Sequence, residues 1–405
     1  MIRTKMNIKL SLAALFAAGA VMGTAVSANA ADLGGDCCAD LEERVADLEA
    51  TTARKGNRKV SLTIYGQVNV ALMHWDTGGD DDVYVVENDS SSTRLGFKGK
   101  AKINSDVSAG YRIELGVHSA ESDRVDENND DGDGNRIVIR RSAMFLASKT
   151  YGKVTWGHTG HAFYDTSKAD LSGTHVVARN DGERYIEDFS LFNANGAVNA
   201  IADWNDIFPG DYDFSRQNVI RYDSPTLAGF VVSASWGEDD EYSAALRYAG
   251  EFGAIRVAAA FGYGRDREND GNGRREAYDG SFSIMHTPTG LWVSASGGNR
   301  EFVDSGDEEE FYQVKAGIQQ KWNSLGKTTL YGEYLHTEID DVDPLGVNAN
   351  VTGAEGDLYG FGVVQKIDAA AMELYAGYRH YEADLTNGVA VQDAETVVVG
   401  SRIKF

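Results

Sequence analysis

The sequence of 405 residues contains only 2 cysteines and 4 prolines. Because Cys37 and Cys38 are adjacent, they cannot form a framework of disulfide bonds between distant parts of the chain. Proline cannot donate a hydrogen bond within a sheet, so its scarcity allows long, uninterrupted strand ladders. High counts of glycine (45), tyrosine (19) and phenylalanine (16) agree with a β-rich fold. We therefore expect a sheet that is held together by backbone pairing alone.

Long apolar runs are absent after the first 30 residues. No later stretch approaches 18 consecutive apolar residues, which excludes a membrane protein built from helices. The one long apolar run, at 10–26, follows three cations and ends in an Ala-Asn-Ala motif at 28–30. This is the pattern of a cleaved secretory signal, so we expect residues 1–30 to be removed on export.

Positive charge is also scarce, with 38 Lys and Arg against 62 Asp and Glu and a formal net charge of −24. Removal of Arg3, Lys5 and Lys9 with the signal takes this charge from −24 to −27. So acidic a surface repels nucleic acid, and we expect no nucleic-acid partner.

Strict alternation of apolar and polar side chains recurs from residue 58 to residue 405. In the first such segment, one face carries Val60, Leu62, Ile64, Gly66, Val68, Val70 and Leu72, and the other carries Ser61, Thr63, Tyr65, Gln67 and Asn69. About sixteen segments of roughly ten residues follow this pattern, the length needed to cross a bilayer when tilted. The pattern predicts an all-β fold, a 16-stranded antiparallel transmembrane β-barrel over 58–405.

The connections between these segments alternate between short and long. Short connections lie at 104–108, 149–153, 224–229, 286–290, 323–327 and 368–370. Long acidic loops lie at 75–91, 119–135, 265–275, 300–308, 339–356 and 383–395. A soluble sandwich or propeller does not predict this asymmetry, whereas a membrane barrel does. The final segment, which ends at Phe405, is expected to pair with the first, because hydrocarbon does not tolerate an open sheet edge.

Three motifs resemble the trimeric general porins of Gram-negative bacteria, and more narrowly the alphaproteobacterial ones. Ser92-Thr93-Arg94-Leu95-Gly96-Phe97-Lys98-Gly99 is similar to the second strand of that family. Asn218-Val219-Ile220-Arg221-Tyr222-Asp223-Ser224-Pro225 is similar to its strand after the third loop, and Phe405 to its terminal aromatic residue. The Pro-Glu-Phe-Gly-Gly signature of the family's third loop is missing.

The resemblance implies a homotrimer in the bacterial outer membrane, a water-filled channel for passive diffusion of small hydrophilic solutes and ions, and an inward-folded third loop at 159–215. It implies contact with outer-membrane lipid and lipopolysaccharide, and recognition of Phe405 by the barrel-assembly machinery. A substrate-specific channel for a sugar or another nutrient is the alternative. No G-x-S-x-G motif in a strand-turn-helix setting supports an enzyme, and no catalytic residue is assigned.

A charge-selective channel needs opposed charges across a narrow, hydrated gap. Alternation turns the basic side chains of 94–102 toward the lumen. Arg140 and Arg141 are consecutive in a strand, so one of the two must also point toward the lumen. The candidate basic residues are Arg94, Lys98, Arg112, Arg140 and Arg141. Arg141 shares its parity with the apolar Ile137 and Ile139, a conflict that only a β-bulge would resolve. Ion preference stays open, because net acidity favours cations and the basic ladder favours anions.

The long loop supplies candidates for the acidic side. They are Asp165, Asp170, Asp181, Glu183, Glu187, Asp188, Asp203 and Asp206. We select Glu183, Glu187 and Asp188, because residues in the middle of a loop project farthest into the lumen. Ordinary solvated loop charges are the competing interpretation.

Residues 129–134 have the spacing of carboxylate and amide ligands found in an EF-hand calcium loop. Position 12 of that loop would be Arg140 rather than Glu, which excludes an EF-hand. We assign no cofactor and no metal-ligating residue. The composition does allow loosely bound divalent cations. Acidic loops could share them with the phosphates of lipopolysaccharide.

Residues 31–57 differ from the rest, because Leu41, Val45 and Leu48 repeat with heptad spacing among charged residues. A short trimeric coiled coil on the periplasmic side is one interpretation, and a lone amphipathic helix is the other. Two heptads are stable only where the barrel already holds three helices together.

Extension of this heptad places Cys38 at a core position. Mild oxidation of the folded protein should therefore yield cross-linked species of up to three chains on non-reducing gels. A Cys37→Ser/Cys38→Ser variant is the control. Absence of any cross-linked species from the oxidised wild type would support the lone helix.

Overall fold

A computed structural model describes residues 59–179, 183–199, 202–210, 212–267, 274–342 and 353–405. The expected signal peptide (1–30) and the expected coiled coil and short N-terminal helix (31–57) lie outside the described residues. None of the helices in the described ranges has the length and apolar character needed to cross a bilayer.

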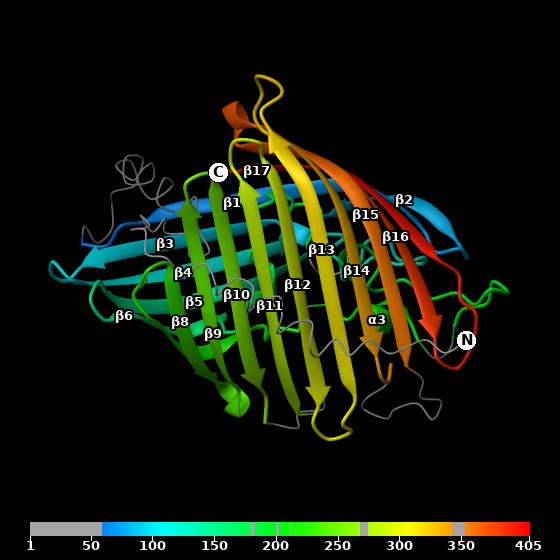
Figure 1. The fold of residues 1–405 in the computed structure, drawn as a ribbon, viewed down its shortest axis with the longest axis horizontal. Coiled ribbons are helices and arrows are strands. Elements are labelled where there is room, and N and C mark those ends of the chain that lie inside the picture. The colour runs from blue at the N-terminus through cyan, green and yellow to red at the C-terminus, as the bar shows by residue number, and fades with distance from the viewer. Residues whose placement is uncertain (1–58, 180–182, 200–201, 211, 268–273, 343–352) are drawn as a thin grey trace.

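Seventeen strands form one sheet (Figure 1). They are β1 (Thr63–Asp76), β2 (Asp81–Glu87), β3 (Arg94–Lys102), β4 (Val107–His118), β5 (Arg136–Ser148), β6 (Gly152–Gly160), β7 (Arg216–Asp223), β8 (Phe230–Gly237), β9 (Tyr242–Phe252), β10 (Ile255–Arg265), β11 (Arg275–His286), β12 (Leu291–Phe302), β13 (Glu308–Gln320), β14 (Thr328–Ile339), β15 (Ala354–Ile367), β16 (Met372–Leu385) and β17 (Ala394–Lys404). Each strand pairs antiparallel with its neighbours.

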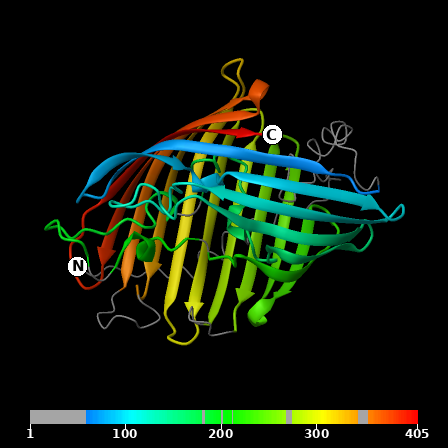
Figure 2. The same ribbon diagram turned by 180° about the vertical axis from the view of Figure 1, so that it is seen from behind.

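The sheet closes because β1 pairs with β17, Gln67 opposite Lys404 through Asp76 opposite Glu395. On its other side β1 pairs with β2 along one part and with β3 along another. The turn η1 (Asp89–Ser91) separates β2 from β3, so the two together occupy the place of one barrel strand. The seventeen segments therefore make a closed barrel of sixteen strands, as the sequence predicts, and Figure 2 shows its N-terminal half from behind.

Alternation separates the two faces of the wall as expected. On β1 the apolar Ile64, Val68, Val70 and Leu72 are exposed. The intervening Gln67, Asn69, Ala71, Met73 and Trp75 are buried. The exposed set forms the outer surface of the barrel, and the buried set points inward, where polar residues can hydrogen-bond with one another.

A β-bulge in β5 resolves the conflict over the two consecutive arginines. Glu114 of β4 lies opposite Arg141, and the next residue of β4 lies opposite Ile139, so Arg140 is the extra residue. The interpretation that Arg141 shares a face with Ile137 and Ile139 is therefore wrong. A bulge reverses the parity of a strand, and it turns both arginines inward while both isoleucines stay outside.

The first long loop expected from the sequence, 75–91, is in fact mostly ordered. β1 continues to Asp76, and β2 returns along it from Asp81, so the hairpin turn is short.

The connection between β6 and β7 covers 161–215, close to the loop expected at 159–215. It contains η2 (Thr166–Lys168), η3 (Glu183–Tyr185) and α3 (Trp204–Ile207). The side chain of Asp203 accepts hydrogen bonds from two backbone N–H groups of α3, and Asp206 completes a capping box. We call residues 161–215 the long segment.

Insertion of a charge into the outer surface tests the assignment of faces. Val70→Lys places an ammonium group at the middle of β1, where burial in hydrocarbon should lower the free energy of unfolding by about 2–4 kcal/mol. His74→Lys places the same group on the same face near the strand end, and we expect a loss of about 0–1 kcal/mol. Urea titration of the protein refolded in lipid measures both, and equal losses would contradict the assigned depth.

Candidate functional site

A cavity of about 500 Å³ lies between the inward side chains of β3, β4, β5, β7 and β9 and the first part of the long segment. Among the described residues, eight basic side chains line it: Arg94, Arg112, Arg140, Arg141, Lys168, Arg179, Arg216 and Arg247. Three carboxylates line it as well: Glu114, Asp165 and Asp170. Its wall therefore carries an excess of positive charge.

Glu114 organises the basic residues of β4 and β5. Its Oε2 lies 2.7 Å from a guanidinium nitrogen of Arg112, and its Oε1 lies 3.3 Å from Nε of Arg140. Arg112 also donates to the hydroxyl of Tyr65, which in turn donates to Glu114. One buried carboxylate thus holds two cations in place, which leaves much of their charge directed at the cavity.

Tyr164 of the long segment lies beside three further cations. The charged groups of Arg141, Lys168 and Arg216 are 5.8, 5.7 and 4.8 Å from the centre of its ring. The hydroxyl of Tyr164 accepts a hydrogen bond from Arg216. The negative face of an aromatic ring attracts cations, so this ring keeps the three side chains clustered without neutralising them.

The first part of the long segment contacts inward side chains of the opposite wall. Lys315 of β13 lies 2.7 Å from Asp170, which also accepts a hydrogen bond from Ser294 of β12. Arg247 of β9 donates to the carbonyl oxygens of Ala162 and Tyr164, at 2.8 and 2.7 Å. These contacts join the segment to β9, β12 and β13.

The middle of the long segment contacts a different part of the barrel. The hydroxyl of Tyr185 is hydrogen-bonded to Ser90 and Asn88 near η1. The carbonyl oxygen of Arg179 accepts hydrogen bonds from Gln313 of β13 and Arg379 of β16. The long segment is therefore attached at strands on both sides of the barrel.

Four of the five basic residues selected from the sequence, Arg94, Arg112, Arg140 and Arg141, line the same cavity. Lys98 lines a neighbouring cavity of about 450 Å³, which Arg112 and Arg141 also line. The structure thus brings all five basic candidates to one region of the inner wall.

The acidic candidates occupy other positions. Glu187 and Asp188 are paired with Arg124 of the connection 119–135, at 2.8 and 3.4 Å, and do not line the 500 Å³ cavity. Burial raises the pKa of Glu187 to about 7, against the opposing effect of Arg124 and Arg184. Glu183 belongs to η3, and its side chain lies outside the described part of the structure, as does Asp181.

Sequence reasoning did not single out Lys168, Arg179, Arg216 or Arg247. Arg247 follows Ser243 and Ala245 on the inward parity of β9, so alternation alone could have identified it. The positions of Lys168 and Arg179 depend on the path of the long segment, and Arg216 is the first residue of β7. Neither a loop path nor a strand end has a periodic pattern in the sequence. Asp165 and Asp170 were among the eight acidic candidates, but their position near the start of the segment argued against them.

The chain matches the profile of the Gram-negative porin family over residues 14–392. It is 24% identical over 332 residues to a chitoporin of Vibrio furnissii, covering 73% of this chain and 82% of that protein. An anion-selective porin from Comamonas acidovorans has a TM-score of 0.57 at 16% identity, covering 85% of this chain and all of that one. The trimer form of OmpT from Vibrio cholerae has a TM-score of 0.54 at 17% identity, covering 85% and 99%.

The profile match covers most of the chain, so this protein belongs to the Gram-negative porin family. It is a porin of the bacterial outer membrane, and its closed barrel forms a channel across that membrane. The family and the fold are those of non-enzymatic channels.

The Asp170–Lys315 pair is one of the contacts that attach the long segment, and the Asp170 side chain is only 6% exposed. Burial alone would raise the pKa of Asp170, but Lys315 and His175 outweigh it and lower the pKa below the ordinary value of 3.8. The stabilisation is therefore present above pH 3.8 and is lost as the pH falls toward the lowered value.

Asp170→Asn should lower the free energy of unfolding at pH 7 by about 3–5 kcal/mol, because it leaves Lys315 buried without a counter-charge. Asp170→Asn/Lys315→Met removes both charges and should recover most of this loss. Urea titrations at pH 7 and at pH 3 measure the effect. Between pH 7 and pH 3, the free energy of unfolding should fall more for the wild type than for Asp170→Asn. An equal fall in both proteins would contradict the assigned role of the pair.

Proposed function

We propose that the long segment folds into the barrel as its third loop and narrows the channel at the 500 Å³ cavity, where the excess of basic side chains makes this porin prefer anions. The observation that supports this most directly is the lining itself, eight basic residues against three carboxylates among the described residues. The basic side of the constriction is then Arg94, Lys98, Arg112, Arg140 and Arg141 together with Arg216 and Arg247.

The contacts of the long segment support an inward path. Asp170, Ala162 and Arg179 bond to side chains of the barrel wall that alternate with the exposed apolar set. A loop that stayed above the rim would not contact β9, β13 and β16 in this way. For the acidic side we propose Asp165 and Asp170, with Glu183, Glu187 and Asp188 placed farther along the same loop.

Charge selection follows from the distribution of charge in the cavity. Nearby cations outweigh the effect of burial and lower the pKa of Asp165, so this carboxylate stays ionised and faces the arginines. A solute that crosses the cavity meets a wall with net positive charge, which raises the local concentration of anions and lowers that of cations. The acidic outer loops do not reverse this preference, because exposed charges are screened by salt within about 10 Å.

We propose that three chains form the functional unit, as in the trimer form of OmpT. The outer apolar surface would contact lipid, and the acidic loops would share divalent cations with the phosphates of lipopolysaccharide. The C-terminal strand with Phe405 would be the segment that the barrel-assembly machinery recognises. The second-strand motif at 92–99 supports placement in the alphaproteobacterial branch.

A substrate-specific sugar channel is the second candidate, and the match to a chitoporin is the observation that favours it. A dedicated channel for chitin fragments binds its sugar, so oligosaccharides of N-acetylglucosamine would block ion current in a saturable manner. A general pore would show conductance that rises linearly with salt and no such block.

Planar bilayers with a salt gradient test the proposed ion preference. We expect the wild-type reversal potential to have the sign of an anion-selective channel. Loss of one unit charge at about 7 Å in water changes the energy of chloride by about 0.6 kcal/mol and that of potassium by the same amount in the opposite sense. Arg141→Gln and Arg216→Gln should therefore each lower the chloride-to-potassium permeability ratio about sevenfold.

Lys321→Gln is the matched control, because it removes one positive charge from a side chain that is 60% exposed on a turn and does not line the cavity. We expect the permeability ratio of this variant to equal that of the wild type. A cation-selective wild type, or equal ratios for all four proteins, would refute the proposed constriction.

A further inference from the structure

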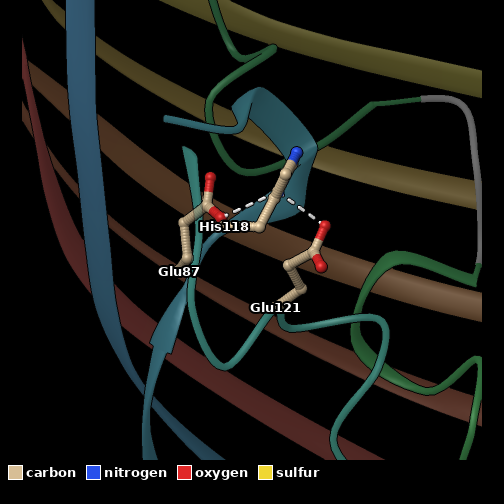
Figure 3. Close-up of side chains that lie close together, drawn as sticks. All are labelled: Glu87, His118 and Glu121. Carbon is tan, nitrogen blue, oxygen red and sulfur yellow. Dashed lines mark hydrogen bonds and ion pairs between the residues drawn. The ribbon is translucent and has the colours of Figure 1, made fainter. Parts of the chain in front are cut away.

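Three side chains that commonly bind metals meet beside the long segment, outside the cavity described above (Figure 3). Glu87 ends β2, His118 ends β4, and Glu121 follows in the connection to β5. They are 4%, 5% and 4% exposed. One ligand atom from each lies within 4.8 Å of the other two. Residues from two separate parts of the chain thus form one buried cluster.

Both carboxylates point at the same ring nitrogen, as Figure 3 shows. Nδ1 of His118 lies 3.1 Å from Oε2 of Glu87 and 2.6 Å from Oε1 of Glu121. Donor atoms bound to one ion at about 2.1 Å lie roughly 3.0–3.4 Å apart. The two nitrogen–oxygen distances lie at or near this range, so one ion could bind all three donor atoms after a small rearrangement.

The second oxygen of each carboxylate and Nε2 of His118 also have contacts with neighbouring residues. The backbone N–H of Thr93 donates to the other oxygen of Glu87, and Arg136 donates to the other oxygen of Glu121. Nε2 of His118 lies over Gly116, where an added Cβ would be only 2.4 Å away. Outer contacts of this kind orient metal ligands and strengthen their binding.

The side chains around the cluster carry a net negative charge, which favours a bound cation. Asp89 and Asp123 lie beside Glu121, with one oxygen of each within 4.8 Å of it, and Arg184 pairs with both. Four carboxylates thus face the guanidinium groups of Arg136 and Arg184, and a third, that of Arg124, is shared between Asp123, Glu187 and Asp188. The surroundings therefore stay negative, and a divalent cation on a neutral imidazole would offset more of this charge than a protonated imidazole does.

A second, separate observation points the same way. Asp123 is 5% exposed, and its Oδ1 has no hydrogen-bond partner among the described residues. A buried carboxylate oxygen without a hydrogen-bond partner is costly, and a cation bound nearby would lower this cost.

We propose that Glu87, His118 and Glu121 form a binding site for one divalent transition-metal ion of the zinc class. An imidazole nitrogen with two carboxylate oxygens suits zinc, nickel or cobalt better than magnesium or calcium, which bind oxygen ligands. The ion replaces the proton that Nδ1 shares with the carboxylates, and this proton passes to the solvent. Water completes the coordination.

The site has a structural consequence for the channel. Ser122, next to Glu121, donates to the carbonyl oxygen of Arg184 at 2.8 Å, and Arg184 pairs with Asp89 and Asp123. A bound ion would therefore fix the connection 119–135 against both the barrel wall and the middle of the long segment.

Calorimetric titration of the chelator-treated, folded full-length protein in detergent with zinc chloride tests the proposal. We expect one tight site per chain, with no competition from excess magnesium. His118→Gln and Glu121→Gln should each weaken this site at least tenfold, and zinc should raise the Tm of the wild type but not that of either variant. Anomalous scattering at the zinc edge should place the ion beside Nδ1 of His118.

His336→Gln is the matched control, because His336 is paired with Asp357 at 2.8 Å and, within the described ranges, belongs to no group of three possible ligands. It should bind zinc like the wild type. Each variant is first checked for heat-dependent migration on gels, and Glu87→Gln replaces His118→Gln if the latter does not fold. The proposal is overturned if the folded wild type binds no zinc, or if the ligand variants bind it with wild-type affinity and stoichiometry.

Discussion

Closure of the backbone ladder between β1 and β17 is the constraint on which the rest of the structure depends. In a bilayer each peptide group must find its partner in a neighbouring strand, because no water replaces it. Phe405 meets this demand at the seam, where its N–H donates to the carbonyl of Gly66 and its carbonyl accepts from the N–H of Gly66. Because the closed sheet has no open edge, backbone pairing holds the wall together. The side chains can therefore alternate between the lipid and the interior of the barrel.

That freedom concentrates charge inside the barrel. The outer surface is apolar, so charged residues of the strands lie inward or near strand ends, where each must find a partner. Arg379 pairs with Glu333, Arg402 with Glu373, and Glu114 with both Arg112 and Arg140. The long segment supplies further partners, such as Asp170 for Lys315. Packing of this segment is therefore governed by charge pairing as much as by apolar contact.

Two sets of residues share β4 and differ in their balance of charge. Around the cavity cations outnumber carboxylates, which suits passage of anions through water. Around His118 carboxylates outnumber guanidinium groups, and burial makes the deficit costly. The long segment borders both, through Asp165 at the first and Arg184 at the second. A change in its position would alter both sets together.

Period-two alternation determined the barrel, its sixteen strands and the positions of most connections, because the side-chain pattern of a strand is local and survives in the sequence. The same pattern located Arg94 and Arg112. Tertiary structure decided the rest. Only the bulge at Arg140 turned Arg140 and Arg141 inward together, since a bulge leaves no composition signal. Likewise, Glu87 and His118 lie 31 residues apart in the chain and meet only because β2 and β4 end at one place, and the partners of the long segment depend on a path without any repeat.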